Sequence, residues 1–302
     1  MTLALTGATG FVGQAVLDEA MRRGMEVRAL TRREQEPRDG VEWIAGDLGT
    51  SDALTRLAEG CQFVLHIAGV VNAPDAAGFR QGNVSGTQNV VEATRQAGCS
   101  RFVHVSSLAA REPTLSDYGH SKRLAEEVVQ VSGLDWTIVR PPAVYGPRDT
   151  EMFDLFRAAQ WRFMPMPPPG RTSIIHVGDL ARLLLDLVAP AETVRDRIFE
   201  PDDGTAGGWT HKELARAVGQ AVGKSVWAPN LPHKLLTGAA RIDRSIRGDK
   251  AKLTPDRARY MSHPDWVADP AKRVPRDIWE ATTTTHQGLA TTAQWYRDAG
   301  WL

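Results

Sequence analysis

The chain has 302 residues, which is enough for one large domain or two modest ones. Its 36 Lys and Arg residues balance 36 Asp and Glu residues, and this formal net charge of zero gives no reason to expect a nucleic acid or an anionic membrane as a partner. The two cysteines, Cys61 and Cys99, lack the spacing of a metal or redox motif and favour a reducing cytoplasm. No signal peptide and no membrane span is expected, because the chain opens on a strand-like run at 2–6 and no run approaches ~20 apolar residues.

The first half of the chain alternates short apolar runs with segments of helical periodicity. Near-continuous apolar strands that alternate with helices are typical of a parallel sheet covered by helices on both faces. Strands are predicted at 3–5, 27–31, 41–45, 63–68, 102–106 and 136–140. Helices are predicted at 12–23, around 53–57, at 83–97 and at 118–131.

The pattern changes after Pro141. Prolines cluster at 165–169, a strand is predicted at 174–177 and a helix at 179–188, and from about residue 210 the chain is helical but broken by further prolines. We therefore predict an α/β protein built on a doubly wound Rossmann sheet, with a smaller, mostly helical cap that binds the substrate. The sheet domain is assigned residues 1–145 and 173–200, and the cap is assigned residues 146–172 and 201–302.

Three glycines, Gly7, Gly10 and Gly13, follow the first predicted strand and open the first predicted helix. In that position the first glycine allows a tight turn, the second lets the backbone approach a pyrophosphate, and the third allows the helix to pack closely on the sheet. An ordinary glycine-rich turn is the alternative. The strand–turn–helix context favours a dinucleotide site, which would include the intervening residues Thr9, Phe11 and Val12.

The residues after the second strand distinguish NAD from NADP. An acidic residue there would bind the ribose 2′-hydroxyl, whereas an arginine accommodates a 2′-phosphate. Thr31 is followed by Arg32 and Arg33, so we predict NADP(H) rather than NAD(H), with Arg32 the better candidate and two solvated loop arginines as the alternative. After the third strand, Asp47 and Leu48 are candidates for the adenine site, although Asp47 could equally cap the next helix.

Polar residues that suit carbonyl reduction follow at the ends of later strands. Tyr118 and Lys122 share one helix face, so the lysine is expected to lower the pKa of the phenol, which is about 10 when unperturbed. Tyr118 would then exchange a proton with a carbonyl oxygen while a nicotinamide exchanges hydride. Ser106 and Ser107 end the fifth strand and could donate to that oxygen, and the Asn83 amide could anchor a relay water. Strand-end capping by Ser107 and helix capping by Asn83 are the alternatives.

These motifs resemble the short-chain dehydrogenase/reductase superfamily, on its extended or atypical side, with dihydroflavonol-reductase-like and epimerase/dehydratase-like members. The resemblance implies catalytic places for Ser107, Tyr118 and Lys122, a supporting place for Asn83, and a possible homodimer. It also implies cofactor contacts from Ile67, Ala68, Gly69, Val105, Ser106, Pro141, Ala143 and Val144. The matching segments are 6–13, 66–69, 83–90, 105–107, 118–122, 140–147, 176–180 and, at the end of the chain, 288–302.

The chain also departs from that family pattern. Ser107 precedes Tyr118 by only 11 positions, so the loop at 108–117 must be tight, and Ser106 could be the carbonyl donor instead. Arg32 replaces the acid that NAD-dependent epimerases carry after the second strand. Nucleotide-sugar enzymes tend to have an arginine directly before the strand at 174–176, but here Arg171 lies one step earlier, which weakens a nucleotide-sugar substrate.

The leading hypothesis is a cytoplasmic NADP(H)-dependent oxidoreductase acting on a small hydrophobic ketone or alcohol, without a metal. One alternative is a nucleotide-sugar epimerase or dehydratase with tightly bound NAD, and another is a non-catalytic NADPH-binding accessory or sensor protein, which would not need the Tyr–Lys pair. The segment at 231–246 is expected to be a packed helix rather than a membrane-surface helix. An apolar group, which could line the substrate pocket or form the cap's own core, comprises Phe153, Phe156, Trp161, Phe163, Met164 and Met166.

Overall fold

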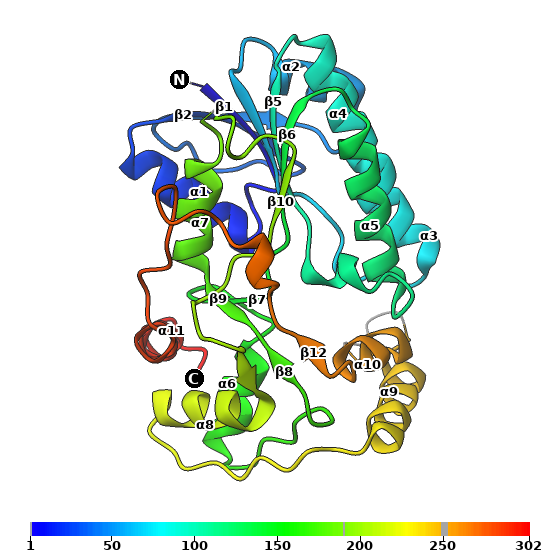
Figure 1. Ribbon diagram of the computed structural model, residues 1–302, viewed down its shortest axis with the longest axis vertical. Helices are drawn as coiled ribbons and strands as arrows, with labels where there is room; N and C mark the ends of the chain where they lie inside the picture. The colour runs from blue at the N-terminus through cyan, green and yellow to red at the C-terminus, as the bar shows by residue number, and fades with distance from the viewer. Residues whose placement is uncertain (1, 190, 249–252) are drawn as a thin grey trace. The chain divides into compact units, whose positions relative to one another are not determined.

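The computed structural model describes residues 2–189, 191–248 and 253–302, and it divides into two compact units (Figure 1). The first unit comprises Met1–Arg140, Leu180–Glu200 and Val274–Trp279, and the second comprises Pro141–Asp179, Pro201–Arg273 and Glu280–Leu302. This division differs from the predicted one at three places. Residues 141–145 and 173–179 fall in the second unit, and the short segment 274–279 falls in the first.

The first unit is built on one seven-stranded sheet. Its strands are β1 (Thr2–Thr6), β2 (Glu26–Thr31), β3 (Val41–Ala45), β4 (Phe63–His66), β5 (Arg101–Val105), β6 (Asp135–Val139) and β10 (Arg197–Phe199). Their order is β10-β6-β5-β4-β1-β2-β3, and every neighbouring pair is parallel. Every residue of β4 and β5 is buried, as expected for strands covered on both faces. The predicted Rossmann sheet is therefore confirmed, and only the short edge strand β10 was not predicted.

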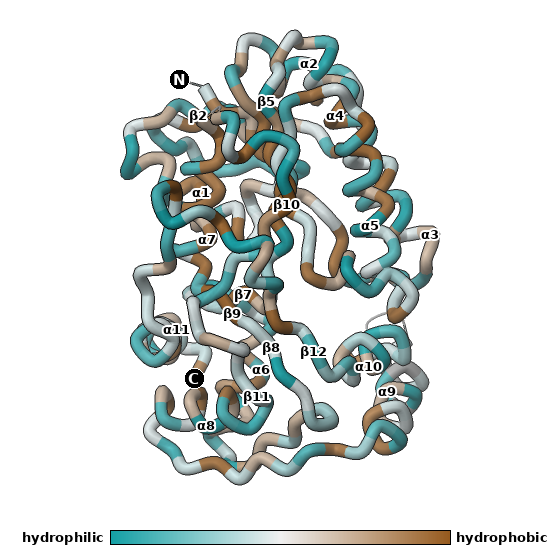
Figure 2. The backbone as a smooth tube through the Cα atoms, viewed as in Figure 1, coloured by the Kyte–Doolittle hydropathy of each residue, from teal (hydrophilic) through white to brown (hydrophobic). Residues whose placement is uncertain are grey.

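Helices and sheet of the first unit enclose a core in which Leu54 and Leu57, Val90 and Val129 pack against the strand residue Phe102. Each fully buried aliphatic side chain of this kind contributes roughly 1.5–3 kcal/mol to folding. Figure 2 shows hydrophobic residues gathered along the strands of this sheet. The helices are α1 (Phe11–Arg22), α2 (Ser51–Ala58), α3 (Ala76–Phe79), η1 (Arg80–Ser85), α4 (Gly86–Gln96), η2 (Leu108–Arg111) and α5 (Asp117–Gln130), and α7 (Val177–Asp186) ends in this unit.

The predicted helix at 83–97 begins earlier than expected. The chain becomes helical at Ala76 and passes through the six-residue π-helical segment η1 before α4. Asn83 therefore lies inside a continuous helical path and not at its start. π-helical turns are rare and often occur at functional sites, because the extra residue per turn displaces the side chains that follow.

The second unit is mostly helical, as predicted, and it also contains a two-stranded and a three-stranded sheet. Strand β7 (Ala143–Tyr145) pairs with β9 (Ile174–His176), and β8 (Arg171–Thr172) lies between β11 (Trp209–Thr210) and β12 (Asp265–Trp266). These strands have two or three residues each, and only β9 was predicted, within the strand at 174–177, because the others are too short for a periodicity to emerge. The helices are α6 (Phe153–Gln160), α8 (His211–Ala221), α9 (His233–Arg247), η4 (Pro270–Lys272), α10 (Pro255–Met261) and α11 (Thr285–Asp298). In the described part of the chain, no helix is long and apolar enough to span a bilayer.

The apolar residues predicted at 153–166 could either line a substrate pocket or form the core of the second unit, and the structure distinguishes these roles for several of them. Phe156, Met164 and Met166 are buried against α8 and α11, so they form this unit's own core and do not line a pocket. Trp161 and Phe163, in contrast, are exposed. The predicted helix at 231–246 corresponds to α9, whose Leu236 and Ala240 pack with Ala258 of α10.

Candidate functional site

The carboxyl ends of the parallel strands form one edge of the sheet, and most of the candidate residues follow directly after them. Strand order reverses between β1 and β4, because β1 pairs with β2 on one side and with β4 on the other. Ligands of open α/β sheets bind at such a switch point. The loops after Thr6 and His66, which end these two strands, therefore meet at the expected place.

The glycine turn after β1 leaves no room for side chains. Gly7 has a φ of +77°, and a Cβ on Gly13 would lie 2.0 Å from the Gly7 carbonyl oxygen. Gly10 donates to that same oxygen over 3.0 Å and forms the N-cap of α1. No side chain caps this helix and its first turn has no acid, so its N-terminal N–H groups suit an anion. Thr9 is exposed on the turn, while Phe11 and Val12 are half-buried. These residues fit a pyrophosphate.

Arg32 and Arg33 follow β2 as exposed residues, and the Thr31 hydroxyl, which donates to the Arg33 carbonyl over 2.6 Å, fixes the turn. Asp47 lies near enough to Arg32 for the arginine to contribute to a lowered pKa of this carboxyl, although hydrogen bonds from Gly49 and Thr50 contribute more. The Asp47 side chain thus shapes the turn into α2, whose N-cap is Thr50 and not Asp47.

Leu48 packs against α4, because a Cβ on Gly86 would lie 2.7 Å from its Cδ1. Its carbonyl accepts a hydrogen bond from the Asn89 side chain over 2.7 Å. The loop that carries Asp47 and Leu48 is therefore held on α4 by both packing and hydrogen bonding.

The loop after β4 joins the glycine turn to the polar residues on α5. The Ala68 amide, next to Ile67, donates to the Thr6 hydroxyl over 3.2 Å. A Cβ on Gly69 would lie 3.0 Å from Asn83 Oδ1 and 3.7 Å from Lys122 Nζ. Only a glycine lets this loop pass so close to both groups.

Tyr118 lies in the first turn of α5, where Ser116 is the N-cap and accepts from the Gly119 amide over 3.0 Å. The Tyr118 phenol is hydrogen-bonded to the Ser107 hydroxyl. A Cβ on Gly119 would lie 2.6 Å from the Ala109 carbonyl oxygen, so α5 touches the short helix η2. This close contact explains how Ser107 reaches Tyr118 across a spacing of only 11 residues.

Lys122 is buried, and its ammonium donates to the Val105 carbonyl over 2.8 Å. Burial lowers the pKa of Lys122 to about 8, while the negative charge of Glu126 opposes that shift. The predicted lowering of the Tyr118 pKa by Lys122 is not what the structure gives. Burial raises the pKa of Tyr118, and the bond to Ser107 is what opposes the rise.

Asn83 uses its side chain to hold the loop after β4 against α5. Its Oδ1 accepts from the Val70 amide over 2.6 Å, and its Nδ2 donates to the Val70 carbonyl and to Ser121 Oγ over 2.9 Å each. Both amide hydrogens are therefore engaged by protein atoms, which gives the side chain a positioning role in place of the predicted water anchor. The Asn83 carbonyl accepts from the Thr87 hydroxyl over 2.6 Å.

A buried ionic network next to these residues was not predicted. Ser106 donates over 2.5 Å to Glu126, which also binds Arg140 through two hydrogen bonds of 2.6 and 2.8 Å. Arg140 and Arg111 both bind Glu200, over 3.3 and 3.4 Å. Glu126 lies four residues after Lys122 on α5, and this helical spacing was the one signal in the sequence that could have indicated it. The Ser106 hydroxyl thus binds Glu126, which leaves Ser107 as the serine that interacts with Tyr118.

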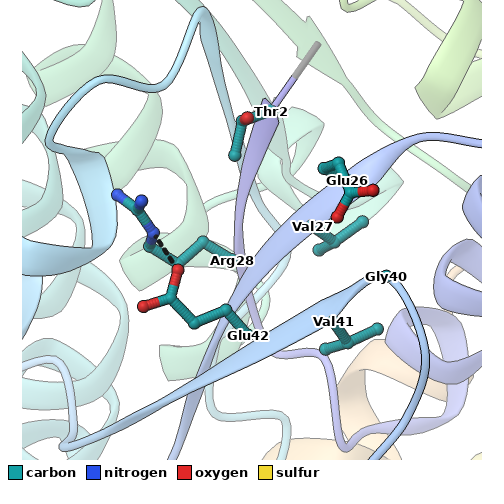
Figure 3. A pocket seen from close by; sticks show the side chains of 7 residues that line it. All are labelled: Thr2, Glu26, Val27, Arg28, Gly40, Val41 and Glu42. Atoms are coloured by element: carbon teal, nitrogen blue, oxygen red, sulfur yellow. Dashed lines mark hydrogen bonds and ion pairs between the residues drawn. The ribbon is translucent and has the colours of Figure 1, made fainter.

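Pro141, Ala143 and Val144 belong to the second unit, where Ala143 and Val144 pair with Ile174 and Ile175. Their predicted contact with the cofactor stays a prediction. A separate hollow of about 350 Å³ lies at the amino ends of β1, β2 and β3, where Arg28 and Glu42 form an ion pair of 2.7 Å (Figure 3). That is the opposite edge of the sheet from the glycine turn, so the hollow is not part of this site.

Comparison with known proteins agrees with this geometry. A ceramide reductase of Caulobacter vibrioides is 39% identical over 312 residues, which cover 99% of this chain and 96% of that protein. A 4-hydroxy-2-methyl-3-oxo-4-farnesyl-3,4-dihydroquinoline-1-oxide ketoreductase of Stigmatella aurantiaca is 31% identical over 215 residues, 61% of this chain and 64% of that protein. The crystal structure of gox2253 superposes with a TM-score of 0.80 at 24% identity, covering 100% of this chain and 99% of that one.

The model of the NAD(P)H-binding family matches residues 7–189, a span that begins at the first glycine of the turn and ends just after α7. That span contains the glycine turn, the loop after β4, and the residues Ser107, Tyr118 and Lys122. The chain therefore belongs to the NAD(P)H-binding family and is an NAD(P)-dependent enzyme of the extended short-chain dehydrogenase/reductase type.

Proposed function

We propose that the protein is an NADP(H)-dependent reductase of a hydrophobic, lipid-derived ketone, with Tyr118 as the proton donor. The observation that carries the proposal is the grouping of three residues at the carboxyl end of β5: Ser107 follows that strand and interacts with Tyr118 of α5, and the buried Lys122 of the same helix donates to the Val105 carbonyl over 2.8 Å. The product would be the alcohol, formed when one hydride reaches the carbonyl carbon and one proton reaches its oxygen.

The residues divide the work of that reaction. Bound nicotinamide would supply the hydride. The Ser107 hydroxyl would donate to the ketone oxygen, and the Tyr118 phenol would deliver its proton to the same atom. To deliver a proton the Tyr118 phenol must be protonated, and burial, which raises its pKa, favours that form. Lys122 places its positive charge next to the loop at Gly69, where it would bind the nicotinamide ribose.

Selection of NADP(H) over NAD(H) is assigned to Arg32. Arg32 directly follows β2 at the carboxyl edge of the sheet, where the 2′-position of the adenosine ribose is expected. A planar guanidinium matches a phosphate with two parallel hydrogen bonds, and no acidic residue precedes it in this loop to bind a free 2′-hydroxyl. These features support NADP(H).

The substrate class follows from the chemistry of the site and from the similarity to the ceramide reductase. Hydride transfer combined with a phenolic proton donor requires a carbonyl group, so we propose a ceramide-type lipid that carries a ketone. The farnesyl-bearing substrate in the name of the second relative is likewise a hydrophobic ketone. The lack of an arginine directly before β9 weakens the alternative of a nucleotide-sugar substrate.

The test uses the purified protein with NADPH and a keto-ceramide, and it follows NADPH oxidation together with the mass of the lipid product. One NADPH should be consumed for each ketone reduced. Tyr118→Phe should lower kcat by about 10²–10⁴-fold while the Kd for NADPH changes little. NAD that co-purifies without exchange, together with turnover of a nucleotide sugar, would replace this proposal with epimerase or dehydratase chemistry.

A further inference from the structure

Three large aromatic side chains of the second unit are exposed, on two segments that hydrogen-bond to each other. Trp161 is 85% exposed, Trp227 69% and Phe163 46%. The rings of Phe163 and Trp227 lie 5.3 Å apart, and Trp161 is two residues before Phe163. Single exposed apolar residues are common on protein surfaces, but a cluster of aromatic rings marks an interaction site. We call these three residues the aromatic patch.

The backbone holds the aromatic patch outward. The Trp227 amide donates to the Arg162 carbonyl over 2.9 Å, and the Met164 amide donates to the Trp227 carbonyl over 3.0 Å. This short ladder alternates, so Met164 is fully buried while its neighbour Phe163 is exposed. Arg162 adopts a φ of +58°, a left-handed conformation that is uncommon for a residue other than glycine. The backbone conformation of these two segments therefore keeps the rings exposed.

Basic residues adjoin the aromatic patch. Lys212 and Arg216, both exposed on α8, line a hollow of about 470 Å³ together with Trp227 and the segment that ends at Asn230. The acid next to them in sequence, Glu213, is engaged in the capping box of α8, where it accepts from the amide and the hydroxyl of Thr210 over 2.8 Å each. Glu213 keeps its charge and interacts with Arg216, so the two cations outnumber this one acid beside the Trp227 ring.

We propose that the aromatic patch and the two cations dock the second unit onto a bilayer that contains anionic phospholipids. Tryptophan and phenylalanine rings prefer the boundary between headgroups and acyl chains, and Lys and Arg are attracted to anionic headgroups. The choice of occupant rests on this pairing of rings with positive charge, because a neutral partner would gain nothing from Lys212 and Arg216. The aromatic patch and the two cations lie outside the segment at 231–246.

This inference extends the proposed function, since a ketone on a long-chain lipid would be presented at a bilayer. It does not require hydride transfer, so it is tested without NADPH and without a ketone. The full chain is sedimented with vesicles of phosphatidylcholine alone and with vesicles that also contain phosphatidylglycerol, over a series of NaCl concentrations. Binding is expected only to the anionic vesicles, and it should fall as salt screens the headgroup charge.

Two double variants separate the ring and charge contributions. Trp161→Ala/Trp227→Ala should weaken binding about tenfold or more at every salt concentration. Lys212→Glu/Arg216→Glu should weaken it by a similar factor at low salt and little at high salt. The matched controls lie in the first unit: Val131→Ala, whose side chain is 84% exposed, and Arg22→Glu/Arg195→Glu, which changes the net charge equally. Both controls should bind like the parent chain, and thermal melting verifies that every variant folds.

Three results would overturn the proposal. The first is equal sedimentation with neutral and anionic vesicles. The second is binding that neither double variant changes. The third is a chain that does not bind vesicles but self-associates, as measured by light scattering. If Trp161→Ala/Trp227→Ala abolishes that self-association, the patch is an interface between copies of the chain. Vesicle binding without keto-lipid reduction would instead contradict the proposed function and leave the docking surface standing.

Discussion

Ser106 donates a 2.5 Å hydrogen bond to Glu126, whereas its neighbour Ser107 bonds Tyr118. Ser107 has an extended backbone, with φ −161° and ψ 153°, and successive side chains of an extended chain point to opposite sides. One serine therefore faces the ionic network in the interior and the other faces the phenol. The two adjacent hydroxyls have different partners and should have different effects on catalysis.

Replacing each serine by alanine tests that difference. Ser107→Ala should lower kcat by about 10²–10³-fold, the typical loss of one donor to a developing oxyanion. Ser106→Ala should leave most of the turnover intact but lower the free energy of unfolding by about 1–3 kcal/mol, because Glu126 loses a buried partner. Steady-state NADPH oxidation and thermal melting measure the two effects. The reverse assignment, with Ser106→Ala the slower enzyme, would contradict the geometry.

Lys122 should set the alkaline limb of the activity profile. Burial lowers its pKa to about 8, so the ammonium is present below that pH and lost above it. If activity needs this charge, kcat/KM for reduction should fall as the pH rises through about 8, while the raised pKa of Tyr118 keeps the phenol protonated over the same range. Lys122→Arg, which stays charged, should move the limb to higher pH. A profile that is flat to pH 10 in the parent enzyme would rule out this role.

The same group should make stability depend on pH. Its pKa falls from 10.5, the ordinary value, to about 8 in the folded protein, so between those values the unfolded chain binds more protons than the folded chain. The free energy of unfolding should therefore increase by up to ~3 kcal/mol as the pH rises from about 8 to 10.5. Below pH 8 the lysine is protonated in both states, so it adds no pH dependence there. Denaturant unfolding of the parent and of Lys122→Met across that range isolates the effect, which should be missing from the variant.

Glu126 should connect the ionic network to the lysine. Its negative charge opposes the lowering of the Lys122 pKa, so Glu126→Gln should shift the alkaline limb of kcat/KM to lower pH. The variant should also unfold more readily, because Arg140 would lose the nearer of its two carboxylate partners, at 2.6 Å, and keep only Glu200. Ser106→Ala is the matched control, since it keeps the carboxylate charge. An unchanged limb in Glu126→Gln would show that the network acts on stability alone.

Arg32 should determine the preference for NADPH. Arg32→Ala removes charge-assisted hydrogen bonds worth about 1.5–3 kcal/mol, so the Kd for NADPH should rise by roughly 10–150-fold while the Kd for NADH changes little. Arg33→Ala is the neighbouring control, because Arg33 is also an exposed arginine of this loop. Calorimetry of the parent and both variants with NADPH and NADH gives the Kd of each protein for each cofactor. A parent protein that binds NADH as tightly as NADPH would exclude the 2′-phosphate assignment.

Local patterns in the sequence predicted much of the sheet of the first unit. Apolar runs bounded by glycines indicated β1 to β6, and the glycine turn indicated the strand–turn–helix unit that follows β1. These features depend on a residue and its close neighbours, and a buried parallel strand is apolar throughout, which makes it visible. The spacing of Tyr118 and Lys122 likewise required only helical periodicity.

Only the tertiary structure decided which polar groups meet. Glu126, Arg140 and Glu200 lie on separate elements, and their network depends on how α5, β6 and β10 are brought together. Burial raises the pKa of Tyr118, and the spacing of residues in the sequence does not reveal that burial. The π-helical displacement of Asn83, the burial of Phe156 and the exposure of Trp161 are likewise results of packing. The sequence by itself determined the kinds of residue and their order, whereas their environment arises from contacts between residues far apart in the chain.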